Sequence, residues 1–476
     1  MFTRTEGSHG WVVRAASHYV AAVRSRLIAL TVTAAVAIAA CGSDDDTAST
    51  APTTETATET TEAVVETTEA PEETTPGTTD AAPETTDAPL ADLPAFEPGP
   101  YDVGVQTITI NADSDRPLTV DVWFPIDDAG DAPLHQYTLI PGAVDTSDLA
   151  VVADPSAMAD GPFPLVVYSH GSSGLRYIAS NYTEAIASHG YIVASADHSG
   201  NTALDELLCS RTERAVTAFN RVADVRSVVD EMLNPQNAAT VDFVANVDPG
   251  SIAVTGHSAG GFTTFAAASG YENDLGSIAA DERVGAIIPI SPSIGGDRPA
   301  LDDDAATTTT PERVDPCADG DDASDPLTDE EREAARNRRS ITDEQLASIT
   351  VPALILVGAD DTATPVEPNV TRAWEFLGSD PLYRVELVAG QHQSFTNACR
   401  YFELMPSLPE DLQTLALPLV SSWAEQGCGE GIMDIDRAFE LTNTFAVSFL
   451  DSVFRDGEMI DSETTEIPDD VVFMTK

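Results

Sequence analysis

The fold of this chain is decided by residues 251–268, which read SIAVTGHSAGGFTTFAAA. The opening of this stretch is mostly apolar or β-branched and predicts a buried strand, and the small and aromatic residues after Ala259 predict a helix. Between the two stands Gly256-His257-Ser258-Ala259-Gly260, with the pattern G-x-S-x-G. In a strand-turn-helix context this pattern holds a serine on a sharp turn with its hydroxyl exposed. We therefore predict that Ser258 is a nucleophile.

A serine hydroxyl becomes a good nucleophile only beside a general base, and the base needs a carboxylate to orient it. In this arrangement the acid follows the serine in the chain and the histidine follows the acid. The predicted strand 351–357 ends near Asp360 and Asp361, and the predicted strand 383–388 ends near His392. The carboxyl ends of parallel strands share one edge of a sheet. His392 is therefore the predicted base, and the two aspartates compete for the role of the acid.

One other histidine stands in a comparable place. His198 follows the predicted strand 191–196. It precedes Ser258 in the chain, which is the wrong order for this arrangement. We interpret His198 as a structural residue or as part of a pocket wall.

Acyl transfer also needs N–H donors that point at the developing oxyanion. One donor is expected from the residue after the nucleophile, here the backbone N–H of Ala259. The other is expected from the Gly/Ser-rich loop after the predicted strand 163–168, where Ser172 follows His170-Gly171. We predict that Ala259 and Ser172 form an oxyanion hole.

Four stretches of the chain resemble the α/β-hydrolase superfamily in their order, spacing and strand context. Within that superfamily, the chain is similar to a group of serine esterases that includes bacterial platelet-activating-factor-acetylhydrolase-like, chlorophyllase-like and polyester-hydrolase-like enzymes. The likeness covers roughly residues 100–455. The stretches that carry it are 168–174, 256–260, 358–365 and 390–395.

This resemblance implies serine-dependent hydrolysis of carboxylic esters, either short-chain, phospholipid-acetyl or polyester-like. It implies that Ser258 is the nucleophile, that His392 is the general base and acid, and that Asp361 rather than Asp360 is the orienting carboxylate. It also implies that no cofactor is needed and that the substrate is a small or lipid-like ester. An acyltransferase with the same three residues, a peptidase and a non-catalytic surface-binding homologue stay open as alternatives.

The first forty residues have the features of an export signal. Arginines precede the apolar run Leu27–Ala40, which is too short for a membrane span and suits a signal peptide. The run continues into Cys41, and small residues before a cysteine resemble a bacterial lipobox, which implies a lipid on the Cys41 thiol. Residues 41–95 are rich in Thr, Glu and Pro and predict a disordered acidic tether. We expect an extracytoplasmic protein that is lipid-anchored to the bacterial cell membrane.

Residues 96–460 predict a catalytic domain of the α/β class. Strands alternate with helices, which indicates a mostly parallel sheet of roughly eight strands with helices on both faces. After an antiparallel hairpin of residues 106–111 and 118–124, the predicted strands are 165–168, 191–196, 252–255, 284–290, 353–357 and 383–388, and the predicted helices are 178–188, 215–233, 259–268, 366–377 and 435–454.

Two segments interrupt this alternation, and a third follows it. Residues 292–350 are acidic and predict a cap-like insertion, and residues 403–425 predict a second cover over the site. Residues 461–476 are expected to form a C-terminal tail.

The cysteines indicate disulfides rather than a metal site. After Cys41 four remain, an even number, and in an exported chain this suggests two disulfides with three possible pairings. We predict that Cys399 pairs with Cys428, which leaves Cys209 with Cys317. None of these cysteines has metal-ligand spacing, so no metal is expected.

The charge of the chain restricts its partners. The formal net charge is −56 at pH 7. A polyanion is repelled by phosphate backbones, so we expect no nucleic-acid partner.

Overall fold

The computed structural model of this protein describes residues 91–93, 95–295 and 341–476. The predicted signal peptide, Cys41, nearly all of the predicted tether, Cys317 and most of the predicted cap-like insertion lie outside the described residues.

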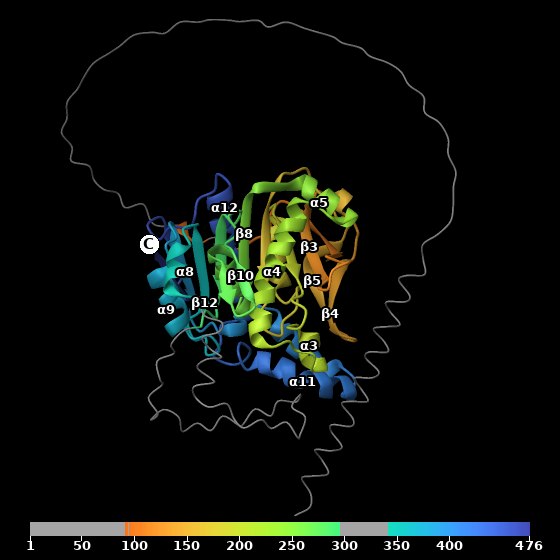
Figure 1. Ribbon diagram of the computed structural model, residues 1–476. Coiled ribbons are helices and arrows are strands. Elements are labelled where there is room, and N and C mark those ends of the chain that lie inside the picture. The colour runs from red at the N-terminus through yellow and green to blue at the C-terminus, as the bar shows by residue number, and fades with distance from the viewer. Residues whose placement is uncertain (1–90, 94, 296–340) are drawn as a thin grey trace, which may run out of the picture. The chain divides into compact units, whose positions relative to one another are not determined.

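One eleven-stranded sheet carries the fold, with the spatial order β15-β13-β12-β11-β8-β6-β7-β3-β2-β5-β4 (Figure 1). The block from β13 to β7 is parallel throughout, and β15, β3 and β4 pair antiparallel with their neighbours. The strands are β1 Ala91–Asp92, β2 Asp102–Ile110, β3 Leu118–Ile126, β4 Leu134–Ile140, β5 Ala143–Val152, β6 Phe163–Ser169, β7 Ile192–Ala196, β8 Val247–His257, β9 Tyr271–Asn273, β10 Gly276–Ile278, β11 Ala286–Ile290, β12 Ala353–Gly358, β13 Leu382–Leu387, β14 Thr465–Glu466 and β15 Val471–Thr475.

Helices cover both faces of this sheet. One face is covered by α4 and α6, which contact β6 and β8, and α2 and α12 pack against each other and the sheet. The helices are α2 Ser180–Ser188, α3 Ala203–Leu208, α4 Arg214–Leu233, α5 Val241–Asn246, α6 Ala259–Ser269, α8 Asp343–Ser348, α9 Val366–Phe376, α10 Ala398–Leu404, α11 Glu410–Ala424 and α12 Ile435–Phe454; the 3₁₀ turns are η1 Pro155–Ala157, η2 Ala238–Thr240, η4 His392–Phe395 and η5 Met405–Ser407. The predicted α/β class and mostly parallel sheet are confirmed.

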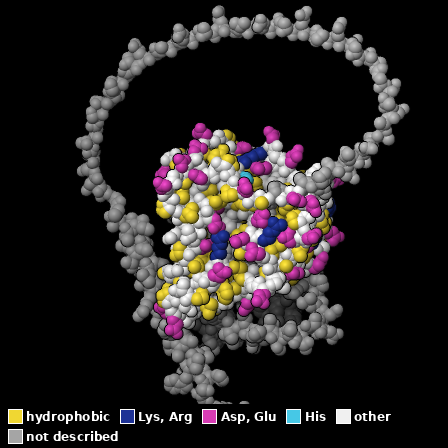
Figure 2. Space-filling view, turned by 180° about the vertical axis from the view of Figure 1, so that it is seen from behind, with side chains coloured by type: hydrophobic (Ala, Val, Ile, Leu, Met, Phe, Trp, Pro, Cys, Tyr) yellow, Lys and Arg dark blue, Asp and Glu magenta, His cyan; other side chains and the backbone are white. Residues whose placement is uncertain are grey.

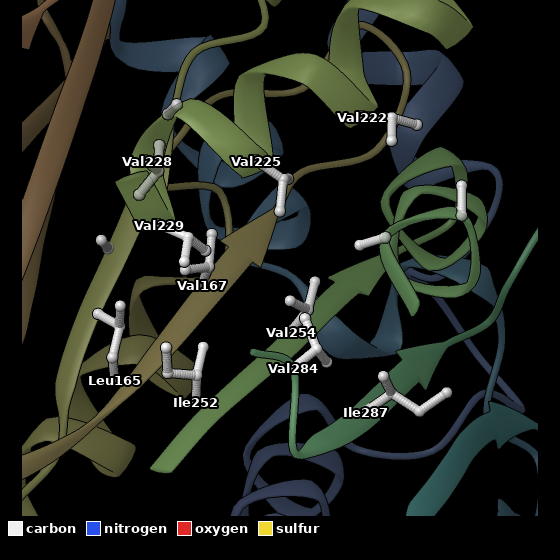
Figure 3. Close-up of a cluster of buried hydrophobic side chains, with 14 of the residues drawn as sticks. Leu165, Val167, Val222, Val225, Val228, Val229, Ile252, Val254, Val284 and Ile287 are labelled. Carbon is white, nitrogen blue, oxygen red and sulfur yellow. The ribbon is translucent and has the colours of Figure 1, made fainter. Parts of the chain in front are cut away.

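Helical spacing of valines explains how α4 packs. Val222, Val225 and Val229 recur every three or four residues, so they lie on one side of the helix. Figure 3 shows Val225 and Val229 directed at the strands that carry Val167 (β6) and Val254 (β8). All five side chains are buried. This packing holds α4 against the strands whose carboxyl ends carry the candidate site.

The sheet is wider than the roughly eight strands expected from the alternation of elements. At one edge, β4 and β5 form a hairpin that turns at Gly142, whose φ of 93° glycine adopts without strain. At the other edge, β15 pairs with β13. The expectation that residues 461–476 form a tail outside the domain was therefore wrong. Phe473 of β15 stacks on Phe445 and Tyr383, which buries apolar surface that a free tail would leave exposed.

The surface of the described part is rich in carboxylates. Figure 2 shows Asp and Glu side chains spread across one face, with Lys and Arg at scattered points among them. Within the described residues, no helix is both long and apolar enough to cross a bilayer.

Candidate active site

The predicted elbow lies at the junction of β8 and α6. Ser258 has φ 59° and ψ −115°, a strained backbone conformation for a residue with a side chain. Hydrogen bonds brace it on both sides, from Ser258 N–H to the carbonyl of Ile290 at 2.9 Å and from Ser293 N–H to the carbonyl of Ser258 at 3.1 Å. The strain is thus imposed by the surrounding sheet, and the Ser258 side chain stays partly exposed.

Glycines permit this turn because the backbone of β6 approaches it closely. A Cβ added to Gly260 would lie 1.8 Å from the carbonyl oxygen of Ser169, and one added to Gly256 would lie 2.5 Å from the same atom. Both distances are shorter than any tolerable contact, so only glycine fits at these two positions. The G-x-S-x-G pattern therefore reflects a close approach between β6 and the elbow.

His392 and Asp361 form a buried pair at the carboxyl ends of β13 and β12. His392 Nδ1 lies 2.8 Å from Asp361 Oδ2, and both residues are 4% exposed. The other oxygen, Asp361 Oδ1, accepts hydrogen bonds from the N–H groups of Ala363 and Thr364 at 2.9 and 2.8 Å. Asp360, the alternative acid, has an exposed side chain. Of the two aspartates, the structure brings Asp361 to His392.

The surroundings of Asp361 keep it ionised. Burial raises the pKa of Asp361, but the hydrogen bonds from His392 and Thr364 oppose this, and the net pKa lies below its usual value. The Thr364 hydroxyl lies 2.8 Å from Asp361 Oδ2 and 3.1 Å from His392 Nδ1. An ionised carboxylate at Nδ1 holds the imidazole in the tautomer whose other nitrogen can accept a proton.

His392 is joined to the elbow through the residue before the serine. His257 Nε2 lies 2.7 Å from the carbonyl oxygen of His392, so the His257 ring donates this bond. The ring centroids of the two histidines are 4.5 Å apart. Burial is the largest cause that lowers the pKa of His257 to about 3, so the ring is neutral near pH 7. Ser258 and His392 are thus held at the same end of the sheet.

The loop after β6 lies against the same elbow. A Cβ added to Gly171 would lie 3.3 Å from Ser258 Cβ, which shows how near the two chain segments run. Ser172 follows with an exposed side chain. Ala259 is the first residue of α6, and a helix leaves its first N–H groups without partners inside the helix. Ala259 and Gly171, the residue that precedes Ser172, therefore lie next to Ser258.

His198 lies elsewhere in the fold, in a second Ser-His-Asp arrangement. His198 Nε2 lies 2.8 Å from Ser169 Oγ, and His198 Nδ1 lies 2.9 Å from Asp224 Oδ2. The exposed fractions are 0% for Ser169, 1% for His198 and 2% for Asp224, so no substrate reaches these side chains. Burial, and next the charge of Arg221, lower the pKa of His198 to about 4. This burial supports the interpretation of His198 as a structural residue.

Sequence analysis missed Asp224 and Arg221, which are both buried on α4. Charged side chains on a helix are ordinarily solvent-facing, and nothing in the local pattern marks these two. The Arg221 side chain lines a cavity of about 20 Å³ together with Ala259, Phe262 and Ser293. Arg221 therefore lies beside the candidate oxyanion hole.

The segment after His392, which is predicted to cover the site, is closed into a loop by a disulfide. The helices α10 and α11 pack on each other, and α11 also contacts α3. Cys399 and Cys428 are bonded, which confirms the predicted pair. Cys209 is disulfide-bonded as well. Its predicted partner, Cys317, lies outside the described residues, so that pairing stays a prediction.

Among the residues that the structure describes, no three His, Cys, Asp or Glu side chains come together as metal ligands would. What the site does offer is a partly exposed serine, a histidine on a buried carboxylate and two N–H groups. Those are the parts that acyl transfer requires.

Comparisons with known proteins bear on the fold. A family model described as platelet-activating factor acetylhydrolase, isoform II, matches residues 148–221. A ferulic acid esterase from Streptomyces cinnamoneus is similar in structure, with a TM-score of 0.50 and 20% sequence identity over 82% of this chain and 98% of that chain. The comparison with curated proteins gave no match. The chain thus has the α/β-hydrolase fold, and it resembles esterases of that fold.

Proposed function

We propose that this protein is a serine esterase that hydrolyses carboxylic esters with Ser258, His392 and Asp361. The observation that carries the proposal is the 2.8 Å contact between His392 Nδ1 and Asp361 Oδ2. The pair lies on the same sheet edge as a serine in a strained elbow conformation. The match to an acetylhydrolase family model and the likeness to an esterase structure support ester hydrolysis.

The proposed reaction depends on which ring nitrogen of His392 is hydrogen-bonded to Asp361. With its Nδ1–H directed at Asp361, His392 has Nε2 free to take the proton of Ser258 as the serine attacks the acyl carbon. The N–H groups of Ala259 and Ser172 stabilise the oxyanion that forms. His392 then protonates the leaving alcohol and activates water, which releases the acid.

The cavity described beside the elbow is small. The cavity of about 20 Å³ beside Ala259 has room for about one water molecule, so it would not take a long acyl chain. Phe262 and Ala218 are buried walls of this cavity. We therefore propose short-chain esters, including acetyl esters of lipid-like alcohols, as the substrate class.

The proposed location is the outer side of the bacterial cell membrane, with a lipid on Cys41. It rests on the apolar run and the small residues before Cys41. Labelled palmitate should enter the protein in a bacterial host and not the Cys41→Ser variant. Equal labelling of both proteins would refute the anchor.

The decisive test of the activity compares the full chain with two serine variants. The substrates are p-nitrophenyl acetate, butyrate and octanoate, with methyl ferulate added because one structurally similar protein is a ferulic acid esterase. Ser258→Ala should lower kcat by about 10⁶-fold with no change in melting temperature. Ser172→Ala is the matched control, since its side chain is exposed and its proposed role belongs to its backbone N–H.

Three outcomes of this test are informative. Turnover by the wild type and Ser172→Ala alone supports the esterase. Retained turnover in Ser258→Ala refutes the assigned nucleophile. Appearance of an acylated product when a sugar or lipid alcohol is added, in place of free acid, would establish an acyltransferase instead.

A further inference from the structure

A buried arginine, Arg221, forms hydrogen bonds to the backbone of the loop that carries Ser172. Arg221 is 1% exposed, and its guanidinium donates through Nη1 to the carbonyl of His170 at 2.6 Å and through Nη2 to the carbonyl of Gly171 at 2.8 Å. Its Nε and Nη2 also donate to Asn201 Oδ1 at 2.9 and 2.7 Å. Two successive peptide carbonyls are thus held by one planar, rigid group.

Holding the Gly171 carbonyl determines where the next N–H points. The C=O of Gly171 and the N–H of Ser172 belong to one peptide bond, which is planar and trans, so the two groups point in opposite directions. Because Arg221 draws the carbonyl toward α4, the Ser172 N–H is directed away from it. In the part of the chain that the structure describes, this N–H has no hydrogen-bond acceptor. It is available to a ligand.

The peptide that Arg221 holds lies close to the elbow at Ser258. A Cβ on Gly171 would lie 3.3 Å from Ser258 Cβ, so the peptide that Arg221 holds runs beside the nucleophile. Arg221 also lines the cavity that contains Ala259, which supplies the other proposed oxyanion donor. A small rotation of the Gly171–Ser172 peptide would move an N–H out of reach of the oxyanion.

The second Ser-His-Asp arrangement anchors the same loop from the other side. Arg116 makes two hydrogen bonds to Asp224, at 2.6 and 2.7 Å, and Asp224 orients His198. The backbone N–H of His198 donates to His170 Nε2 at 3.1 Å, and the other ring nitrogen of His170 lies 2.7 Å from the carbonyl of Gly171. The Gly171 carbonyl is therefore held by both the arginine and a buried histidine.

We propose that Arg221 is a positioning residue that orients the Ser172 N–H for oxyanion stabilisation. This inference rests on the proposed esterase activity. Arg221 does not touch the reacting atoms and acts through the carbonyls of His170 and Gly171. A guanidinium is costly to bury, and here its donors are directed at the backbone of the loop that carries the oxyanion donor.

The test compares Arg221→Met, Arg221→Lys and Arg226→Met in the full chain. Arg226 is the matched control, because it lies on the same helix, donates to the backbone carbonyl of Ala279 and is exposed. The assays are hydrolysis of p-nitrophenyl acetate and inhibition by a trifluoromethyl ketone, whose serine adduct places an oxyanion in the hole. The pH profile of kcat/KM is recorded in parallel.

Arg221→Met should lower kcat by about 10²-fold, the lower end of the effect of removing a whole oxyanion donor. KM should stay within about threefold, and the inhibition constant of the ketone should rise in proportion to the loss in kcat. The midpoint of the pH profile should not move, because the contact of His392 with Asp361 is untouched. Arg221→Lys, which keeps the charge without the planar fork, should lose less, and Arg226→Met should equal the wild type.

Several results would overturn this assignment. Wild-type kcat in folded Arg221→Met, or a loss of kcat with unchanged affinity for the ketone, would reduce Arg221 to a structural role. If Arg221→Met does not fold, Arg221→Lys decides, and wild-type kcat and ketone affinity in that variant would refute the proposal. An inactive wild type would instead refute the proposed function, and the inference with it.

Discussion

Removing the disulfide between Cys399 and Cys428 should destabilise the protein mainly through its unfolded state. The bond joins residues 29 positions apart, and closing a loop of that length removes about 12 cal/mol/K of chain entropy, or about 3.6 kcal/mol at 25 °C. The double variant Cys399→Ala/Cys428→Ala should therefore unfold in urea with a free energy lower by about that amount. Substitution is preferable to a reductant, because Cys209 is also disulfide-bonded.

The folded double variant should remain active at 25 °C. The segment after His392 keeps other contacts, since Gln393 N–H donates to the carbonyl of Gln426 at 2.8 Å and Gly427 packs against Gln393. We expect kcat within about threefold of the wild type but a lower temperature of inactivation. Unfolding can be followed by tryptophan fluorescence, with thiol titration to verify that the wild type is oxidised. If the free energies of unfolding of the oxidised wild type and the double variant differ by less than about 1 kcal/mol, the loop-entropy reasoning is refuted.

Two further predictions concern the buried network. Asp361→Asn should lower kcat by about 10⁴-fold, because an amide favours the wrong tautomer of His392. Asp360→Asn, at an exposed position, should leave kcat unchanged, and equal losses of kcat in the two variants would contradict the assignment of the acid. The pKa of His198 is about 6.5 in the unfolded chain and about 4 in the folded protein, so the unfolded chain binds a proton more readily. The neutral His198 ring therefore contributes to the free energy of unfolding above pH 6.5, and this contribution is lost as the pH falls toward 4. The share of this loss that is due to His198 should be about 2 kcal/mol at pH 5 relative to pH 7.5, and His198→Gln should reduce the total loss by that amount in urea titrations at the two pH values; an unchanged total loss would show that His198 is protonated in the folded protein.

The groups proposed to react could be located from the sequence because each is marked by local chemistry. Ser258 lies in a pattern whose glycines are required, because a Cβ on Gly260 would lie only 1.8 Å from the carbonyl oxygen of Ser169. His392 follows a buried strand in the expected order. The choice between Asp360 and Asp361 depended on one residue of spacing, and the side chain on the correct side of the turn is the one that reaches His392.

The edges of the sheet could not be predicted in the same way. The strands β4 and β15 lie at the two edges and are partly exposed, so their sequences do not show the continuous apolar runs of buried parallel strands. β15 is stable as a strand because it pairs with β13 and stacks Phe473 on side chains of other elements. Such pairing depends on residues that are distant in the chain.

By itself, the sequence determined the α/β class, the elbow serine, the histidine that follows the last parallel strand and the order in which they occur, because these depend on periodicity and on contacts between near neighbours. Only the tertiary structure decided that Arg221 and Asp224 turn inward, where Arg221 holds the carbonyls of His170 and Gly171 and Asp224 orients His198. Whether a charged side chain on a helix faces solvent or a buried carbonyl depends on which segments pack against it. That packing brings together residues far apart in the chain, and no local pattern records it.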